Sequence, residues 1–469
     1  MFDRFYIEDK MNYQETLEYL NSFVNFEYKL KDLASSELKL DRIVSLLEAL
    51  GNPQNKLNII HVAGSKGKGS VCAFTAQILK EAGFKVGLYT SPHINCLRER
   101  IRLLSFRHVK RPDDLFSDQI NEEEFARLVS EMRTVIDQQN ERSKHGRLSF
   151  FEILTALALY YFYQRGADFV VLETGLGGRL DATNAVNALV SVITPISLEH
   201  TQILGSTVRE IAGEKAAIIK PSTKRVVVAA QEEDAADVIK GRCSALNKKG
   251  KFIGEDLTYQ RIYQNLYKEV FRIETKRTFY FNLTIPLIGT HQLENATVAF
   301  GVIESLRELG YDVDDWAISH GMANVQWPGR FEVIHKSPYV IIDGAHNGAS
   351  MANLVRTFKG LFPNCLATVI AGFSHDKDIK SICEELLPIA QRVVVTRSQH
   401  PKAADLSAEE IKNLFPFISR VKISNIEESI QSVLHNAGPD DVVLITGSLY
   451  VVSEARKILV SDLRPATSH

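Results

Sequence analysis

Short apolar runs alternate with amphipathic stretches through the first half of the chain. The apolar runs predict buried strands at 58–64, 85–93, 168–175 and 188–197. Apolar positions at helical spacing predict helices at 70–82, 121–136, 149–166 and 208–219. Because strands and helices alternate along the chain, the pattern predicts an α/β domain built on a doubly wound, mostly parallel sheet.

Helix boundary signals accompany three of these helices. Asn121 is followed three residues later by Glu124, and Ser149 is followed at the same spacing by Glu152. This is the spacing of a capping box, in which two side chains satisfy the first backbone amides of a helix. Gly83 follows the predicted helix at 70–82, where glycine commonly ends a helix.

The pattern changes in the second half of the chain. Short alternation between 259 and 287 predicts an antiparallel strand pair, and a helix follows at 293–309. The Pro328-Gly329 pair marks a linker, so we predict domains at 1–325 and 331–469 with a linker at 326–330. Beyond it four strand ends restart the β/α rhythm of a smaller Rossmann-like domain, at 339–347, 366–374, 392–398 and 440–448.

Composition narrows the class of protein. The chain has 469 residues, enough for two or three domains, and a formal net charge of -2. Such a balance gives no field that would attract nucleic acid or an anionic membrane. The N-terminus has no apolar signal region, and we predict a cytoplasmic protein and a monomer. The five cysteines are dispersed, as in a reducing compartment: Cys72, Cys96, Cys243, Cys365 and Cys383.

A glycine-rich loop, "GSKGKGS" at 64–70, lies between the first predicted strand and its helix. Such a loop brings backbone amides and a helix N-terminus to phosphate oxygens, and Lys68 would reach the outer phosphates. The loop departs from the usual P-loop, because Gly69 separates Lys68 from Ser70 and Val62 stands where the first glycine is expected. A glycine-rich turn with a solvated lysine is the alternative.

Three further side chains follow predicted strands of the same sheet. Ser91, Glu173 and His200 each come at or after a strand's carboxyl end, which is where open α/β sheets bind ligands. Taken singly, they also suit a turn serine, a solvated acid and a structural histidine. Together, beside one phosphate loop, they predict an Mg²⁺–nucleotide enzyme whose acceptor substrate stays open. Lys215, by contrast, has the spacing of a solvated helix lysine.

The order of motifs resembles the folylpolyglutamate synthase and dihydrofolate synthase family of the Mur ligase superfamily, ATP-dependent enzymes that form amides. The resemblance covers about residues 15–460 and implies a Mur ligase central domain followed by a smaller Rossmann-like domain. The loop with the late serine is this family's form. The motifs, in chain order, are "AGSKGKGS", "TSPH", "ETGLGGRLDATN", "SLEH", "GEKAAIIK", "WPGRFE", "DGAHN" and "GSLYVVSEAR".

The resemblance also implies roles for individual residues. One or two Mg²⁺ ions would be held by Ser91, Glu173 and His200, and Lys215 matches a lysine that is carbamylated in many members. His346 would face the reacting phosphate or the incoming glutamate, and Lys68, Lys215 and His346 form the catalytic set. The positions that match ATP contacts are Gly64, Ser65, Lys66, Gly67, Lys68, Gly69, Ser70, Asn295, Arg330 and Asp343. Those that match the pterin pocket are Phe151, Glu152, Leu180, Asp181 and Ala182.

The implied reaction joins L-glutamate to folates, and to dihydropteroate as well, through an acyl phosphate, with ADP and phosphate as products. The alternative within the class is a folylpolyglutamate synthase without dihydrofolate synthase activity. A Mur-type cell-wall ligase fits less well, because those enzymes have adjacent Lys and Thr in the loop. The rival from another class is a nucleotide-driven switch ATPase, which leaves "DGAHN" and "WPGRFE" without a purpose.

Three features depart from the family pattern. Many bacterial members have Thr-Asn where this chain has Ser65-Lys66, and Lys66 is more typical of the eukaryotic enzymes. The segment 103–119 replaces a shorter turn, which leaves its substrate contacts open. A proline that often follows the asparagine of "DGAHN" is absent. None of these changes touches Ser91, Glu173 or His200, the residues expected to hold Mg²⁺.

Overall fold

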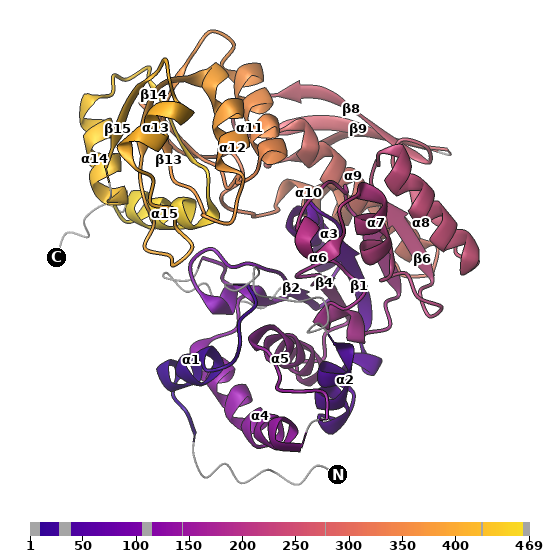
Figure 1. Cartoon of the computed structure of the whole chain (residues 1–469). Coiled ribbons are helices and arrows are strands. Elements are labelled where there is room, and N and C mark those ends of the chain that lie inside the picture. Colours follow the sequence, from indigo (N-terminus) through magenta and orange to yellow (C-terminus); the bar gives the residue numbers. More distant parts are fainter. Residues whose placement is uncertain are drawn as a thin grey trace, which may run out of the picture. The chain divides into compact units, whose positions relative to one another are not determined.

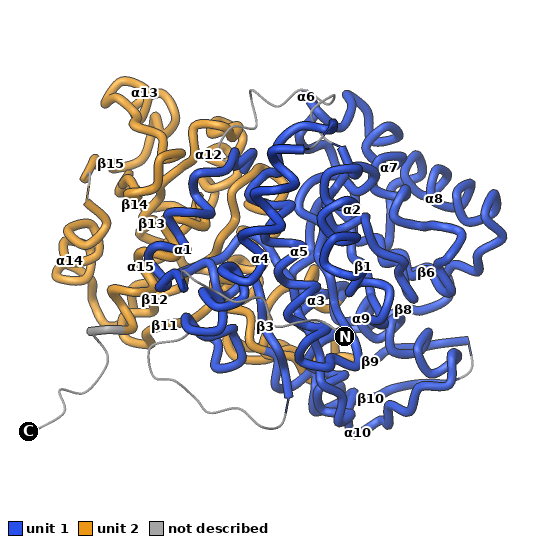
Figure 2. The backbone as a smooth tube through the Cα atoms, turned by 90° about the horizontal axis from the view of Figure 1, so that it is seen from below, with its two compact units in different colours: residues 1–260, 272–283, 294–325 blue, residues 261–271, 284–293, 326–469 orange. Residues whose placement is uncertain are grey.

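The computed structural model describes residues 10–27, 39–105, 115–142, 144–276, 278–423 and 425–462 (Figure 1). The chain divides into two compact units (Figure 2). Unit 1 contains residues 1–260, 272–283 and 294–325, and unit 2 contains residues 261–271, 284–293 and 326–469. No helix in the described ranges is long and apolar enough to cross a membrane.

The sheet of unit 1 has seven strands in the order β3-β2-β4-β1-β5-β6-β7. All neighbours pair in parallel except β2 and β3, which are antiparallel at one edge. The four predicted strands are confirmed as β1, β2, β4 and β5, and they lie side by side. The strands are β1 Asn58–Ala63, β2 Val86–Tyr89, β3 Ile101–Leu104, β4 Phe169–Glu173, β5 Val190–Ile193, β6 Arg225–Val228 and β7 Gly250–Phe252.

Helices pack on this sheet through apolar faces. Side chains of α5 such as Ile153 and Leu157 join Val170 and Leu172 of β4 in one buried cluster. A second cluster joins α7 and α8 to β5 and β6. The helices are α1 Tyr13–Asn21, α2 Leu40–Ala49, α3 Lys68–Glu81, α4 Glu122–Arg142, α5 Phe150–Gln164, α6 Thr201–Leu204, α7 Val208–Ala216, α8 Glu233–Ala245, α9 Thr290–Arg307 (shared between the units) and α10 Asp315–Ala323. Short 3-10 turns are η3 Pro53–Lys56, η4 Leu97–Arg100 and η5 Ala182–Ala185.

The predicted helix boundaries have a physical basis in the structure. The Asn121 side chain accepts the Glu124 amide at 2.8 Å, and Ser149 and Glu152 form the reciprocal capping box of α5. The Glu124 carboxylate forms an ion pair with Arg165. The helix predicted at 70–82 begins two residues earlier, at Lys68, and Gly83 follows it with φ of 93°.

The antiparallel strand pair predicted at 259–287 is wrong in number, because three strands form. They are β8 Leu257–Gln264, β9 Glu269–Thr275 and β10 Phe279–Ile285, in the order β10-β9-β8. Between β8 and β9 the Asn265 amide donates to the Lys268 carbonyl oxygen. Between β9 and β10 the Thr275 amide donates to the Thr278 carbonyl oxygen. Segments 261–271 and 284–293 of this region belong to unit 2, so the compact units do not divide at a single point in the sequence.

The sheet of unit 2 confirms the four predicted strands and adds two edge strands. Its order is β11-β12-β16-β13-β14-β15, with only β11 antiparallel to its neighbour. Alternate residues of its central strands enter two separate cores, one with α11, α12 and α13 and one with α14 and α15, so this sheet is covered on both faces (Figure 1). The strands are β11 Glu332–Lys336, β12 Tyr339–Ile342, β13 Ala367–Ala371, β14 Ala390–Val395, β15 Ser419–Lys422 and β16 Val442–Thr446. The helices are α11 Gly348–Leu361, α12 Ile379–Leu386, η6 Leu387–Ile389, α13 Ala408–Leu414, α14 Ile426–Asn436 and α15 Leu449–Asp462.

A glycine at the contact between α3 and α10 gives the first testable prediction. A Cβ atom on Gly321 would lie 2.4 Å from the Cα of Ile78, so the two helix backbones approach too closely for any side chain there. We expect Gly321→Ala to lower the free energy of unfolding by about 1–3 kcal/mol. Gly241 of α8 has open space at its Cβ, so Gly241→Ala should be neutral or stabilising by up to about 1 kcal/mol. Thermal and urea unfolding of the two variants measures both effects. Equal losses of the free energy of unfolding in Gly321→Ala and Gly241→Ala would refute the close packing at Gly321.

Candidate active site

The glycine-rich loop joins β1 to α3, as predicted, and it needs glycine at two positions. Gly64 has φ of 151°, and a Cβ there would lie 1.8 Å from the Thr194 hydroxyl oxygen. Gly67 has φ of 80°, and its Cβ would lie 2.2 Å from Oδ1 of Asn295. The loop is therefore pressed against β5 and α9, and Asn295 and Gly67, both predicted to contact ATP, lie together.

The first residues of the glycine-rich loop are hydrogen-bonded to the segment that follows β5. The amides of Ser65 and Lys66 both donate to the Pro195 carbonyl oxygen, at 3.0 and 3.2 Å. The Ser65 hydroxyl donates to the Ser197 carbonyl oxygen at 3.0 Å. The loop's first amides thus fix it to the segment after β5. An anion would be bound through the later part of the loop and the start of α3.

Two lysines converge on the carbonyl oxygen of Gly64. Lys68 Nζ donates to it at 3.0 Å and Lys215 Nζ at 2.8 Å. Lys215 also donates to Oε1 of Glu199 at 2.7 Å, and only 1% of the Lys215 residue is exposed. The expectation of a solvated Lys215, drawn from residue spacing, is therefore wrong. The helical pattern of α7 did not reveal that this lysine points at the sheet edge.

Glu199 is a site residue that the sequence reasoning missed. It directly precedes His200 in "SLEH", so a carboxylate at the same strand end was the available signal. Burial acts to raise the pKa of Glu199, but Lys215 and Lys68 outweigh it and hold this pKa below its usual range. Glu199 therefore remains an anion beside two lysines.

Burial changes the charge state of the lysines at this edge. Desolvation, partly offset by Glu199, lowers the pKa of Lys215 to about 8. Burial also lowers the pKa of Lys66 in the loop. An amine with a pKa near 8 is neutral for an appreciable fraction of the time at neutral pH, and a neutral amine is a nucleophile.

The predicted metal ligands follow β2, β4 and β5; β2 and β4 are neighbours, and β1 lies between β4 and β5. Glu173 ends β4, Ser91 follows β2, and the Ser91 amide donates to Oε2 of Glu173 at 3.1 Å. His200, after β5, precedes α6 with φ of 47°. In the described ranges no three His, Cys, Asp or Glu side chains form a ready-made metal cluster. The buried Glu173 carboxylate and the Ser91 hydroxyl are nevertheless hard oxygen donors, which fit Mg²⁺ with waters completing its shell.

One predicted pterin-pocket residue, Phe151, lies beside the loop that follows Glu173. The Phe151 ring fills the space beside Gly175, where a Cβ would lie 2.6 Å from Cζ of Phe151. Glu152 caps α5 and also forms a buried ion pair with Arg42 at 2.9 Å, a partner that the sequence did not suggest.

The segment Leu180-Asp181-Ala182 belongs to the loop that follows Glu173. Asp181 accepts the Leu176 amide at 2.7 Å and the Thr183 amide at 3.0 Å, so its carboxylate braces its own loop. The predicted insertion at 103–119 is only partly described, because residues 106–114 lie outside the described ranges.

Unit 2 brings its own predicted site residues together. The Asp343 carboxylate accepts the amides of Phe331 and Ala345, both at 2.8 Å, and burial raises the pKa of Asp343 while Arg330 opposes that shift. A Cβ on Gly344 would lie 2.9 Å from Nη1 of Arg330. His346 Nδ1 donates to the Gly344 carbonyl oxygen at 2.8 Å, which fixes the tautomer with the proton on Nδ1.

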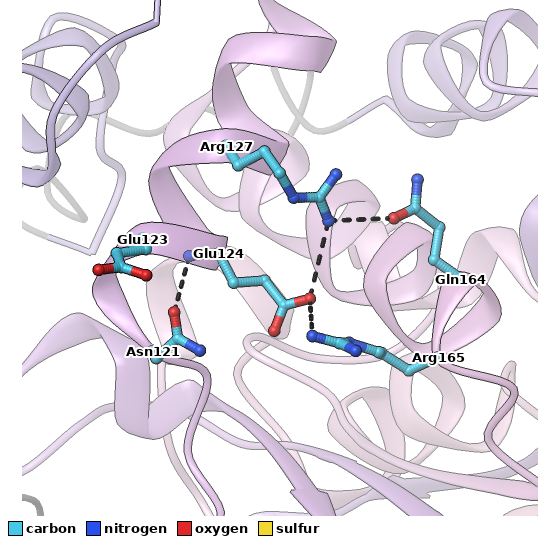
Figure 3. Close-up of a pocket in the computed structure, with 6 residues that line it drawn as sticks. All are labelled: Asn121, Glu123, Glu124, Arg127, Gln164 and Arg165. Atoms are coloured by element: carbon cyan, nitrogen blue, oxygen red, sulfur yellow. Dashed lines mark hydrogen bonds and ion pairs between the residues drawn. The ribbon is translucent and has the colours of Figure 1, made fainter. Parts of the chain in front are cut away.

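A surface pocket of about 370 Å³ lies elsewhere in unit 1, at the start of α4 and the end of α5 (Figure 3). Arg127 lies 3.7 Å from Glu124 and donates to Gln164 at 3.4 Å, and Arg165 pairs with Glu124. The charged side chains of this pocket thus pair with one another. The end of α5 leads to the amino end of β4, whereas Glu173 stands at the carboxyl end of that strand. The pocket is lined by Asn121, Glu123, Glu124, Arg127, Gln164 and Arg165.

Comparison with known proteins identifies the class. The Mur ligase middle domain matches residues 116–303, and the Mur ligase glutamate ligase domain matches residues 329–449. The Bacillus subtilis (strain 168) dihydrofolate synthase/folylpolyglutamate synthase is 34% identical over 436 residues, which cover 90% of this chain and 94% of that protein. The chain is thus a Mur ligase, an ATP-dependent ligase.

Solved structures agree over nearly the whole chain. Mycobacterium tuberculosis folylpolyglutamate synthase, complexed with ADP and AMPPCP, has a TM-score of 0.84 and 28% identity, over 97% of this chain and 99% of that one. An FPGS–AMPPCP–folate complex has a TM-score of 0.80 and 31% identity, over 96% and 100%. The chain belongs to the dihydrofolate synthase/folylpolyglutamate synthase family, and the predicted fold class and resemblance are confirmed.

Lys68 gives a prediction about catalysis. Its ammonium group lies at the start of α3, where it can neutralise charge that builds on a transferred phosphoryl group. We expect Lys68→Ala to lower the turnover rate by on the order of a hundredfold or more, equivalent to about 3 kcal/mol. Lys80→Ala, the same change in the last turn of the same helix, should leave the rate within about twofold. Release of ADP under saturating substrates measures both, and near wild-type turnover of Lys68→Ala would overturn the assignment.

Proposed function

We propose that this protein joins L-glutamate to reduced folates and also to dihydropteroate, with ATP as the energy source. The observation that carries this proposal is the convergence of Lys68 and Lys215 on the glycine-rich loop, with the half-buried Glu199 bound to Lys215 and the buried Glu173 at the end of β4. Two relatives support the acceptors: one is a dihydrofolate synthase/folylpolyglutamate synthase, and the other is an FPGS in complex with AMPPCP and folate.

The first chemical step activates a carboxylate, which is a poor electrophile. The carboxylate oxygen of the folate or dihydropteroate attacks the γ-phosphorus of ATP, ADP leaves, and an acyl phosphate forms. Lys68 neutralises charge on the transferred group, and Asn295, Arg330 and Asp343 contact the nucleotide. Bound Mg²⁺, held by Ser91, Glu173 and His200, would supply further charge neutralisation at the phosphates.

The second step forms the amide. The neutral amine of L-glutamate attacks the acyl carbon, the tetrahedral intermediate collapses, and phosphate leaves while the amine loses a proton. His346 has its Nδ1 proton committed to Gly344, so Nε2 is the acceptor nitrogen of that ring. In this proposal Nε2 faces the reacting phosphate or the incoming amine. Phe151, Glu152, Leu180, Asp181 and Ala182 line the pterin pocket.

We further propose that Lys215 is carbamylated in the active enzyme. The neutral amine attacks CO₂, a nitrogen–carbon bond forms, a proton goes to solvent, and a carbamate anion replaces a cation. The burial of Lys215 and its lowered pKa favour the neutral amine that this reaction needs. The carbamate would then add a carboxylate-like ligand near the second Mg²⁺.

Carbamylation predicts a defined spectroscopic signature. In ¹³C-enriched CO₂ at constant dissolved concentration, a carbamate carbon signal should grow as pH rises through about 8, because the neutral fraction of Lys215 grows over that range. Lys215→Met should abolish the signal. Lys220, whose pKa burial also lowers to about 8 but whose Nζ bonds the Asn184 carbonyl, is the matched control, so Lys220→Met should keep it. A signal that survives Lys215→Met would refute the site of modification.

The acceptor range is tested directly with purified protein. ATP-dependent incorporation of L-glutamate should appear by mass spectrometry with dihydropteroate and with tetrahydrofolate, supplied in separate reactions. Product from tetrahydrofolate alone would make the protein a tail-extending enzyme. We consider this alternative because a Lacticaseibacillus casei relative named folylpolyglutamate synthase is 32% identical to this chain. ATP hydrolysis that ignores both acceptors and glutamate would instead favour a switch ATPase.

The setting of the enzyme is also part of the proposal. All five cysteines are free thiols in the structure, which suits a reducing compartment, and we propose the cytoplasm. The partners we expect are ATP, L-glutamate and the folate or dihydropteroate, and a monomer suffices for the reaction because one chain carries all the proposed site residues.

A further inference from the structure

His61 is a buried titratable side chain to which the proposed reaction gives no role. It lies on β1, the central strand of the sheet of unit 1, and it is fully buried. Burial, aided by the charge of Lys220, lowers the pKa of His61 to about 3, so the ring is neutral at physiological pH. A neutral imidazole has one donor nitrogen and one acceptor nitrogen, and the partners of the two nitrogens show what the ring does.

The Nε2 atom of His61 is hydrogen-bonded to the Thr183 hydroxyl oxygen at 2.8 Å. That hydroxyl has a single proton, which it donates to Oδ1 of Asp181 at 2.5 Å. Because this proton is already committed, the hydroxyl oxygen accepts from the ring, and the proton of His61 lies on Nε2. The three side chains thus form a directed hydrogen-bond relay, His61–Thr183–Asp181.

The other ring nitrogen of His61 makes no such contact. Among the residues that the structure describes, no protein group bonds to Nδ1, although this atom is buried. A buried acceptor without a donor is unfavourable, so an apolar side chain would suit this position better if packing alone mattered. The bond from Nε2 to Thr183 is therefore the polar contact that distinguishes His61 from an apolar residue.

Asp181, at the end of the relay, braces the loop that follows Glu173. Besides the Thr183 hydroxyl, the Asp181 carboxylate accepts the Thr183 amide on Oδ1 and the Leu176 amide on Oδ2. The carboxylate thus joins both ends of the segment 176–183. Because the relay begins on β1, it ties this loop to the central strand of the sheet.

The start of the same loop is held without the relay. The Thr174 amide donates to the Val62 carbonyl oxygen at 2.9 Å, which continues the pairing of β1 with β4 past Glu173. Glu173, the expected Mg²⁺ ligand, is therefore positioned by the sheet itself. The relay acts farther along the loop, on the segment 180–182.

We propose that His61 is a positioning residue for the pterin ring of the acceptor, acting through Thr183 and Asp181 to hold the segment 180–182 in its binding conformation. The inference rests on the proposed function, which assigns this segment to the pterin pocket. It adds a side chain that is itself buried on β1 and acts only through others. Dihydropteroate and tetrahydrofolate both carry the pterin ring, so the relay bears on either acceptor and on neither ATP nor L-glutamate.

The test compares His61→Leu, His61→Asn and His61→Gln in the full-length enzyme. Gln can place an amide donor near the position of Nε2, whereas the shorter Asn reaches only the position of Nδ1. For each acceptor that the wild type uses, we expect His61→Leu and His61→Asn to raise KM about five- to tenfold, with KM for ATP and L-glutamate within about twofold of wild type. His61→Gln should restore most of the affinity.

Thermal unfolding separates positioning from a role in packing. His61→Leu removes the unpaired Nδ1 from the interior, so its Tm should stay within about 3 °C of wild type or rise. A Tm far below that of wild type would mean that the ring serves packing, and would count against the proposal. Ser191→Ala is the matched control, because Ser191 is the buried register partner of His61 on β5 but its hydroxyl bonds to Ile218 and Thr223. KM for the acceptor should not change in this variant.

A double-mutant cycle tests the relay itself. In a Thr183→Val background, His61→Leu should change KM for the acceptor by no more than about twofold, because the hydroxyl that accepts from the ring is gone. The same effect of His61→Leu in both backgrounds, or equal increases of KM for ATP and the acceptor, would overturn the proposal. So would a His61→Gln variant no better than His61→Asn. A wild-type enzyme that ligates no glutamate would instead refute the proposed function.

Discussion

A buried ammonium group is the constraint around which the strand-end site of unit 1 is organised. Lys215 is almost wholly removed from water, so its three donors need acceptors within the protein. Two of these donors bind Glu199, from the loop after β5, and the carbonyl oxygen of Gly64, from the loop after β1. That same carbonyl oxygen accepts Lys68 of α3. One backbone oxygen therefore fastens α7, the glycine-rich loop and the start of α3 to a single edge of the sheet.

In both units, carboxylates hold the loops that follow the strand ends in place. Asp181 accepts amides of its own loop in unit 1, and in unit 2 Asp343 accepts the Ala345 amide of its own loop and the Phe331 amide that precedes β11. Asp376, in the loop after β13, pairs with Lys402 of the neighbouring loop. Each of these acids is held by donors that the backbone or a neighbouring loop supplies. The loops are consequently shaped before any ligand arrives, which lowers the ordering cost of binding.

Most of the fold and much of the candidate site follow from local signals. Apolar runs such as "NIIHVA" and the capping pair Ser149–Glu152 act within a few residues, so their strands and helix were predictable. Contacts across long sequence separations were not. The Arg42–Glu152 pair joins residues 110 apart, and the bond from Lys215 to Gly64 joins residues 151 apart. The resemblance to a ligase family pointed to Lys215, but spacing alone placed it in solvent.

The division of the chain has a consequence for how such a protein can be assembled from parts. Segments 261–271 and 284–293 group with unit 2 although unit 1 resumes between them, so the polypeptide passes from one unit to the other five times. A recombination event at a single junction, even at 325/326, would exchange most of unit 2 while leaving two of its pieces behind. A single recombination junction therefore cannot transfer unit 2 of this ligase intact.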